Sequence, residues 1–424
     1  MSEIQDLKGL LLKVSDISKK YEEKAKESGE NYNVFNILGL STREVRTHSA
    51  FIADLLDPEG LHGEGSIFLE LFIEQIKSKI NFEIKNSAYN NAKIEKEKYI
   101  SEKNNDNTEG GDMDIVIEID NKAIIIENKI YAVDQKCQLV RYYNYGISLY
   151  SKNDFALLYL TLDEQEASNC SIDCNDKDCI EKKENNEKVK EIKIELPKKT
   201  RLDKNIDFIN ITYKEDIKNW LEKCLKQTED KTFFTETLKQ YINLVKQLTG
   251  QAMSDEMRDE ITKIVINKPL YVEAAFYIEE NIFELKKELT KKVVFKFKEH
   301  FENKGYKCKT RDNFGIDQYI HLIVYKRNED FGFGFSFEGN YWNGFFFGIK
   351  VINETYNKNI FEELKRKSIA NSTVSWPYND YCKYRNWDKE VFIKIVNEEF
   401  SQYLIEKIEN VIHIYDNIKE NNNK

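Results

Sequence analysis

The sequence lacks any apolar run of about 18 residues, the length that crosses a bilayer as a helix, within its 424 residues. Its first residues, MSEIQDLKGLLLKVSDISKK, form a charged amphipathic pattern that differs from a signal peptide. Cysteine is also scarce: the chain has seven, an odd number that does not form a secreted disulfide framework. These absences predict a soluble, cytoplasmic protein with no membrane segment.

An excess of basic residues is absent too, because 64 Lys and Arg stand against 74 Asp and Glu, for a net charge of −10. Proteins that coat nucleic acid indiscriminately need a broad basic surface, so this balance argues against that class and leaves room for a local basic groove. The composition is 41% hydrophobic and 33% charged, which provides enough apolar material for a core beneath a charged surface. At this length we expect two domains.

Hydrophobic periodicity changes along the chain in a way that predicts an α/β domain over residues 1–250. Helical patterns occupy the beginning and the end of this domain, whereas strand-like alternation begins near residue 92. The predicted helices cover residues 4–27, two segments on either side of a turn at 57–60, and residues 134–150, 214–227 and 233–248. The predicted strands cover residues 92–100, the two arms of 110–130, and residues 155–163 and 207–213.

A charged insertion at about residues 164–206 separates the last two predicted strands and contains Cys170, Cys174 and Cys179. A structural zinc site uses four nitrogen or sulfur ligands, so these three thiols, with no histidine nearby, are one ligand short. We therefore expect a flexible insertion, although a distant ligand could complete a weak metal site.

Residues 251–424 differ in character and predict an α+β accessory domain that recognises the substrate or a protein partner. Helical patterns at 254–303 and 388–418 flank an aromatic segment at 318–351. Alternating Phe in this segment could form a platform on which bases stack, but it is more typical of the core face of a hairpin. Basic and aromatic residues that could contact a ligand are Lys307, Lys309, Arg311 and those of segment 375–387.

The segment GGDMDIVIEIDNKAIIIENKI (110–130) reads as a β-hairpin with charged groups on one face. Side chains alternate between the faces of a strand, and directly opposed residues share a face. A two-residue turn at Asp120-Asn121 places Asp114 opposite Glu127, and a turn one residue later places it opposite Lys129. Both registers cluster the three charged groups, whereas a three-residue loop without a bulge would separate them.

The aliphatic runs DIVIEI and AIIIENKI indicate strands covered on both faces, where an unpaired acid is costly. A surface salt bridge from Lys129 is the simpler interpretation, and such pairs contribute little to stability. Two carboxylates against one ammonium leave excess negative charge, however, and like charges this close resist joint ionisation. A divalent cation resolves the conflict, because carboxylate oxygens are the hard ligands that Mg²⁺ selects. We therefore favour a site for Mg²⁺ or Mn²⁺.

Asp114, followed by Glu127-Asn128-Lys129 on the adjacent strand, resembles the D-x(n)-(D/E)-x-K core of the PD-(D/E)XK nuclease superfamily. The segments NVFNILGLSTREVRTHSAFIADLLDPEGLHG and DQKCQLVRYY resemble the additional motifs of a bacterial, largely uncharacterised and defence-associated subfamily. The resemblance covers residues 30–250 and implies a mixed-sheet, restriction-endonuclease-like core flanked by helices. Met113 replaces the proline that usually precedes the first acid, and Asp112 is a rival for Asp114.

The resemblance also implies a role for each residue of the motif. Asp114 and Glu127 would ligate the metal together with the backbone carbonyl of Asn128. Lys129 would be the catalytic lysine, assisting the attacking water or the charge that develops on the phosphate. Glu44 would be the acid of the first helix that completes the metal shell.

Three residues of the helix after the hairpin are further candidates. Gln135, Gln138 and Tyr142 share one helix face, which allows Gln138 to point toward the charged hairpin face. By the resemblance Gln138 belongs to the catalytic group, with Gln135 as the second choice, and we expect Gln135 and Tyr142 to contact the substrate. Two glutamines on a surface helix, however, need no function.

The helix that carries Glu44 offers its own alternatives. His48 lies four residues later on the same face, where it could contact a phosphate or be a hydrogen-bonded, partly buried histidine. Glu44 itself could simply be an acid in the first turn of a helix, and we favour the metal shell for it. The two interpretations of His48 stay equally open, as they do for Arg46 and His62.

These residues together predict a metal-dependent endonuclease that hydrolyses phosphodiester bonds of nucleic acid, DNA rather than RNA, in bacterial antiviral defence. The alternative is a non-catalytic module that uses the same fold to bind nucleic acid or a protein of a defence complex. A third hypothesis, compatible with the first, is a dormant nuclease that a partner or signal activates through the C-terminal domain. A homo-oligomer is compatible with the sequence.

Overall fold

The computed structural model describes residues 3–104, 107–132, 134–176, 198–228, 231–327, 329–353, 355–369 and 372–422. The chain divides into two compact units, Met1–Ile264 and Val265–Lys424. The division lies beyond the Gly250 at which the sequence placed it, and Glu260 forms an ion pair of 2.7 Å with Lys20 in the first unit. Among the described helices, none combines the length and the hydropathy that a membrane span requires.

The first unit contains a five-stranded mixed sheet in the order β1-β2-β3-β4-β5. Its strands are β1 (Lys93–Ser101), β2 (Gly111–Ile119), β3 (Lys122–Lys129), β4 (Phe155–Thr161) and β5 (Ile209–Thr212). Strands β1, β2 and β3 pair antiparallel, whereas β3, β4 and β5 pair parallel. A parallel pair needs a crossover connection, and the helix α5 (Gln138–Leu149) lies in the one between β3 and β4. The predicted mixed α/β sheet is confirmed.

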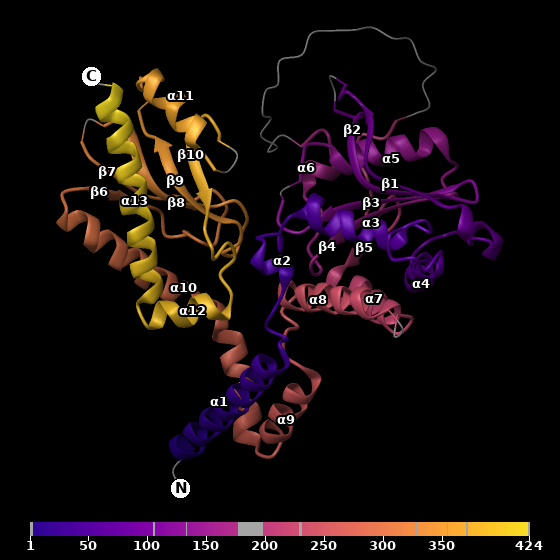
Figure 1. Cartoon of the computed structure of the whole chain (residues 1–424), viewed down its shortest axis with the longest axis horizontal. Coiled ribbons are helices and arrows are strands. Elements are labelled where there is room, and N and C mark those ends of the chain that lie inside the picture. Colours follow the sequence, from indigo (N-terminus) through magenta and orange to yellow (C-terminus); the bar gives the residue numbers. More distant parts are fainter. Residues whose placement is uncertain are drawn as a thin grey trace. The chain divides into compact units, whose positions relative to one another are not determined.

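The other helical elements of the first unit are α1 (Glu3–Ser28), α2 (Val34–Ile37), the π-helical turn η1 (Glu44–Ser49), α3 (Ala50–Leu56), α4 (Ile67–Ile76), η2 (Asn86–Asn91), α6 (Asn169–Ile172), η3 (Tyr213–Ile217), α7 (Lys218–Leu225), α8 (Thr232–Leu248) and α9 (Asp255–Val265). Helices cover both faces of the sheet (Figure 1). On one face Ile115 and Ile126 lie in a core with side chains of α3, α4, α7 and α8. On the other face Val116 and Ile125 lie in a core with side chains of α5. The charged groups near the end of β3, Glu127 and Lys129, are therefore desolvated.

The second unit is an α+β fold, as predicted. Its five-stranded sheet has the order β10-β9-β8-β7-β6 and is antiparallel throughout. Alternate Phe side chains of β8 and β9 lie in one hydrophobic core, which favours the core-face interpretation over a stacking platform. The elements are α10 (Pro269–Asn303), β6 (Lys307–Lys309), β7 (Leu322–Tyr325), β8 (Phe331–Phe337), β9 (Phe345–Val351), α11 (Lys358–Lys367), β10 (Tyr378–Tyr381), α12 (Lys389–Val396) and α13 (Glu399–Asn422).

The cysteines of the charged insertion differ from the expectation. Cys174 forms a disulfide with Cys137, which lies at the start of α5, and the Cys137 amide also donates a hydrogen bond of 2.7 Å to the Cys170 carbonyl. The described part of the insertion is therefore attached to α5 instead of forming a free loop. Cys179 lies outside the described residues. Sequence spacing could not reveal this disulfide, because Cys137 lies 37 residues before Cys174 and outside the insertion.

Candidate active site

The hairpin turn sets the register that brings the charged residues together. Asp120 and Asn121 both have positive φ angles, 50° and 57°, which is the conformation of a two-residue type I′ turn. Asp and Asn tolerate this left-handed region better than other side chains do. Ile119 consequently pairs with Lys122, and Ile115 with Ile126. This is the first of the two predicted registers, in which Asp114 is aligned with Glu127.

The backbone ladder between β2 and β3 ends at the pair Ile115–Ile126, and the Asp114 side chain continues it. Asp114 Oδ2 accepts a hydrogen bond of 2.8 Å from the backbone N–H of Asn128. The N–H and C=O groups of one strand residue point to the same neighbouring strand, so the Asn128 carbonyl faces the Asp114 side as well. The Asn128 side chain lies on the opposite face, where it donates to Ser49 Oγ at 3.0 Å and accepts from the Tyr213 hydroxyl at 3.0 Å.

Glu127 is the most enclosed acid of the site, with 2% of its surface exposed. Its Oε1 atom lies 2.6 Å from Lys129 Nζ and accepts a hydrogen bond of 2.6 Å from Gln138 Nε2. Its Oε2 atom is buried and has no hydrogen-bond partner among the described residues. A buried, unsatisfied carboxylate oxygen is costly, so this atom favours a proton or a cation beside it.

The electrostatics of the site show an excess of negative charge. Burial raises the pKa of Asp114 to about 6, and the Asn128 hydrogen bond and the Lys129 charge offset burial only in part. Burial also raises the pKa of Glu127, an effect that Lys129 opposes and Asp114 strengthens. Burial alone would lower the pKa of Lys129, but the surrounding carboxylates outweigh it and keep the ammonium charged. One cation therefore does not neutralise the acids, and the site favours either a bound proton or a further cation.

Glu44 lies beside the acid pair. Its Oε2 atom accepts hydrogen bonds from the backbone N–H groups of Ile130 at 2.7 Å and Ala132 at 3.4 Å, so Glu44 holds the chain that leaves β3. Its charge nevertheless contributes to raising the pKa values of Asp114 and Glu127. Within the described residues no three His, Cys, Asp or Glu side chains form a group that could hold a metal. The arrangement is thus a pair of carboxylates with a neighbouring third acid.

Comparison with known proteins agrees with this geometry. A protein-family model described as the PD-(D/E)XK nuclease superfamily matches residues 32–243, which is half of the chain. The chain belongs to the PD-(D/E)XK nuclease superfamily. The matched region contains Glu44, the hairpin with Asp114, Glu127 and Lys129, and all of α5. No curated protein and no solved structure matches the chain.

In this member of the superfamily, Asp114 and not Asp112 is the acid that lies next to Glu127. The Asp112 side chain is exposed, whereas its backbone carbonyl accepts a short hydrogen bond from the Tyr142 hydroxyl. Tyr142 is 1% exposed, which contradicts its expected contact with a substrate. The tyrosine instead ties α5 to β2, because α5 covers this face of the sheet.

Gln138, the first residue of α5, and Gln135, in the loop before it, differ in burial and in their contacts with Glu127. Gln138 is buried and donates to Glu127, as the helix spacing predicted. The side-chain oxygen of Gln138, Oε1, accepts a hydrogen bond of 3.1 Å from the backbone N–H of Gln135, which fixes the orientation of the Gln138 side chain. The Gln135 side chain is exposed and accepts hydrogen bonds from Lys103 at 3.0 Å and Arg141 at 3.2 Å. Gln138 therefore positions the acid, and Gln135 lies outside the pair.

His48 is fully buried, which favours the hydrogen-bonded histidine over the contact with a phosphate, the two interpretations that the sequence left open. Its Nδ1 lies 3.0 Å from the Tyr241 hydroxyl and its Nε2 lies 3.0 Å from the Ser41 carbonyl. Burial lowers the pKa of His48 to about 4, so the ring is neutral at pH 7 and links η1 to α8. His62 is buried as well, with Nε2 at 2.9 Å from the Asp57 carbonyl. Arg46 is exposed.

Sequence reasoning did not identify Arg141 as a site neighbour. This guanidinium is buried on α5, three residues after Gln138, and its Nε atom has no hydrogen-bond partner among the described residues. Burial lowers the pKa of Arg141, and the charge of Glu127 opposes the change. The helix spacing relative to Gln138 was the available signal, since residues three apart share a helix face.

Proposed function

We propose that the protein is a divalent-metal-dependent endonuclease that hydrolyses phosphodiester bonds in nucleic acid, DNA rather than RNA. The observation that carries the proposal is the trio of Asp114, which is partly buried, with Glu127 and Lys129, which are buried. One Glu127 oxygen of this trio has no hydrogen-bond partner among the described residues. Membership of a nuclease superfamily supports the same reaction class.

The donor atoms fit Mg²⁺ or Mn²⁺. Asp114, Glu127 and the Asn128 carbonyl would hold the ion, with Glu44 at its edge. Mg²⁺ usually retains several waters and uses one or two carboxylates, so a pair of acids is sufficient. When bound, such an ion supplies a water of lowered pKa and neutralises charge on the phosphate.

The chain's own residues would perform the remaining tasks. The Lys129 ammonium, kept charged by the carboxylates, can donate a hydrogen bond to a phosphate oxygen or orient the attacking water. Gln138 holds Glu127 in place, and Glu44 fixes the backbone that follows Lys129. Asp114, Glu127 and Lys129 lie on strands packed from both sides, which restricts their movement.

The test is a cleavage assay with plasmid DNA and with RNA, in Mg²⁺, Mn²⁺ or EDTA. Asp114→Asn and Lys129→Ala should abolish cleavage, because each removes a group of the trio. Asp112→Asn is the matched control, since it changes an exposed acid two residues away and should cleave like the wild type. Cleavage that survives both site substitutions would rule out this site. An equal loss of cleavage in Asp112→Asn would show that the assignment of Asp114 over Asp112 is wrong.

We infer the biological setting from the resemblance of the flanking motifs to a defence-associated bacterial subfamily. The nuclease would act on invading DNA in the cytoplasm, with the second unit recognising a substrate, partner or signal. A plaque assay on bacteria that express the wild type or Lys129→Ala tests this role. Equal phage titres on both strains would contradict it.

A second candidate function is a non-catalytic binding module with the same fold. The observation in its favour is that fewer than three candidate ligand side chains converge among the described residues. Calorimetric titration with Mn²⁺ separates the two functions. Binding that disappears in Asp114→Asn supports the nuclease, and the absence of binding by the wild-type chain supports the module.

A further inference from the structure

The two faces of the sheet in the second unit differ sharply in chemistry. Along β8 the Phe residues point into the core, so Gly332, Gly334 and Ser336 lie on the other face. Across that face Gly334 pairs with Ile323 on one side and with Gly348 on the other. A Cβ atom built on Gly334 would lie 2.0 Å from the Leu322 carbonyl oxygen, so the close strand approach requires glycine. We call this glycine-bearing side the outer face.

Three cations lie on the outer face or close to its edge. Lys309 of β6 pairs with Ile323, and Lys350 of β9 pairs with Gly332, so both side chains lie on this face. Arg311 follows β6 by two residues and lies near the edge of this face, because its charge contributes to lowering the pKa of His321. Among the described residues none of these three cations forms a salt bridge, whereas Lys287 and Lys291 of α10 each pair with a glutamate three residues earlier. The outer face therefore presents uncompensated positive charge.

The cations are close enough to influence one another. Burial lowers the pKa of Lys350, and Lys309 lowers it further. Burial lowers the pKa of His321 to about 4, and both Lys350 and Arg311 contribute to the decrease. No carboxylate of the described residues offsets either shift. Repulsion among gathered cations is relieved when an anion binds between them.

Aromatic rings support this cluster without being available to a ligand. Lys350 Nζ lies 5.3 Å from the centre of the Trp376 ring, and the centres of the His321 and Trp376 rings are 5.5 Å apart. Trp376 and Phe346 are in edge contact and are only 5% and 7% exposed. Proteins that bind single strands stack bases on exposed aromatic rings. These buried rings position the cations, and what reaches a ligand is positive charge.

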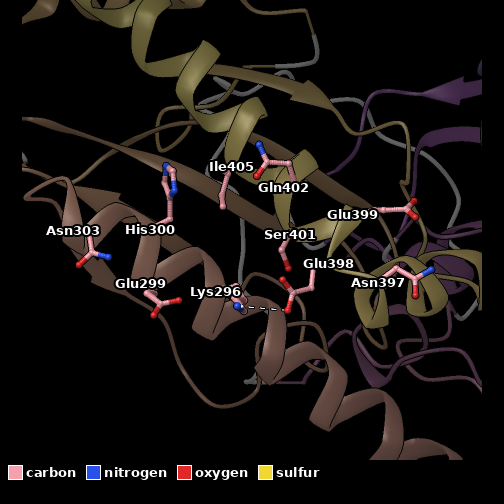
Figure 2. Close-up of a pocket in the computed structure, with 10 residues that line it drawn as sticks. All are labelled: Lys296, Glu299, His300, Asn303, Asn397, Glu398, Glu399, Ser401, Gln402 and Ile405. Atoms are coloured by element: carbon pink, nitrogen blue, oxygen red, sulfur yellow. Dashed lines mark ion pairs between the residues drawn. The ribbon is translucent and has the colours of Figure 1, made fainter.

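A pocket of about 490 Å³ between α10 and the start of α13 in the same unit differs from the outer face in its balance of charge. Figure 2 shows Glu299, Glu398 and Glu399 around it, with Lys296 paired to Glu398 at 3.5 Å. His300, also on its lining, lies 2.9 Å from Glu409. Its cations are matched by acids, so this pocket does not attract a polyanion.

We propose that the outer face of the second unit binds the phosphate backbone of duplex nucleic acid through Lys309, Arg311 and Lys350. Charge complementarity identifies the partner: unpaired cations gather here in a chain whose net charge is −10. Contacts to phosphates hold a duplex without reading its sequence. The inference rests on the proposed function in taking nucleic acid as the polymer, and it gives the second unit the role of holding the substrate.

The experiment is fluorescence anisotropy with the full chain in EDTA, so that binding is measured without cleavage. The probes are a labelled duplex of about 30 base pairs and one of its strands alone, each titrated at several salt concentrations. The test variant carries Lys309→Gln, Arg311→Gln and Lys350→Gln. The matched control carries Lys358→Gln, Lys365→Gln and Lys367→Gln, which removes the same charge from exposed lysines of α11.

We expect the test variant to bind the duplex at least about tenfold more weakly at 50 mM salt, and the slope of log K against log salt to become shallower by about 2 to 3. The control should keep the wild-type slope, and the single strand should bind more weakly than the duplex. A double variant, Lys309→Gln with Arg311→Gln, changes exposed side chains alone and should show a smaller loss of the same kind. It keeps the test decisive if Lys350→Gln disturbs folding.

Wild-type affinity and slope in the test variant, equal loss in the control, or preference for the single strand would each overturn the inference. Its failure is distinguishable from failure of the nuclease proposal. A chain that binds duplex through these cations but cleaves nothing leaves the inference standing and refutes the nuclease. A chain that cleaves, with binding unaffected by the three substitutions, refutes the inference alone.

Discussion

Replacing Gln138 with leucine tests how far the metal site depends on a residue that does not itself bind the metal. Gln138 Nε2 donates a hydrogen bond of 2.6 Å to Glu127 Oε1 in a fully buried setting. Leucine has a similar volume but no donor, so the substitution removes the hydrogen bond without opening a large cavity. The ionised form of Glu127 then loses a stabilising contact, and its pKa, already raised by burial, rises further.

The magnitude follows from the chemistry of that contact. A hydrogen bond to a charged group contributes about 1.5 to 3 kcal/mol. Each tenfold change in affinity corresponds to about 1.4 kcal/mol. We therefore expect the affinity for Mg²⁺ or Mn²⁺ to fall by roughly 10- to 100-fold, which is also the usual cost of losing a group that orients a metal ligand. Cleavage at saturating metal should recover, because Asp114, Glu127 and Lys129 remain.

The assay is a calorimetric Mn²⁺ titration together with the Mg²⁺ dependence of the cleavage rate. Gln135→Leu is the matched control, because its exposed side chain contacts Lys103 and Arg141 and not Glu127. It should bind metal like the wild type. An unchanged metal affinity in Gln138→Leu, or a loss that high metal does not rescue, would refute the reasoning.

Three further predictions concern stability. In EDTA and in guanidinium unfolding, Asp114→Asn should be as stable as the wild type near pH 4 and more stable by roughly 3 kcal/mol at pH 7. Because the pKa of Asp114 is raised to about 6 in the fold, the wild type has its full stability below the unfolded pKa and loses stability as the pH rises and Asp114 ionises, whereas asparagine stays neutral. A difference that does not change with pH would contradict this reasoning. Cys174→Ser should lower the free energy of unfolding by about 4 kcal/mol, since the Cys137–Cys174 bond closes 37 residues, whereas Cys308→Ser, at a free cysteine, should not. His48→Ala should lower the free energy of unfolding by about 2 to 3 kcal/mol, because it leaves the Tyr241 hydroxyl and the Ser41 carbonyl without a hydrogen-bond partner. Cleavage per folded molecule should not change. A loss of cleavage without a loss of stability would show that His48 takes part in the reaction.

The local sequence determined the hairpin and its chemistry. Asp120 and Asn121 accept the left-handed turn conformation, and aliphatic residues on both faces of the strands require burial on both sides. Alternation excludes a slip by one residue, because such a slip would reverse every face, and it leaves the two registers that keep the charged groups together. The clustering of Asp114, Glu127 and Lys129 on one face was therefore predictable, whereas the structure decided which of the two registers forms. The α/β character of the first unit and the core-facing Phe residues of the second were predictable as well.

Only the tertiary structure decided which neighbours complete the site and which do not. His48 is satisfied by Tyr241, 193 residues away, and no local pattern encodes that hydrogen bond. Glu44 reaches the backbone of Ile130, 86 residues away, because η1 packs against the end of β3. The disulfide of Cys137 and the outer face of the second sheet likewise depend on elements distant in the chain. Periodicity assigns a residue to a face, and packing determines what that face meets.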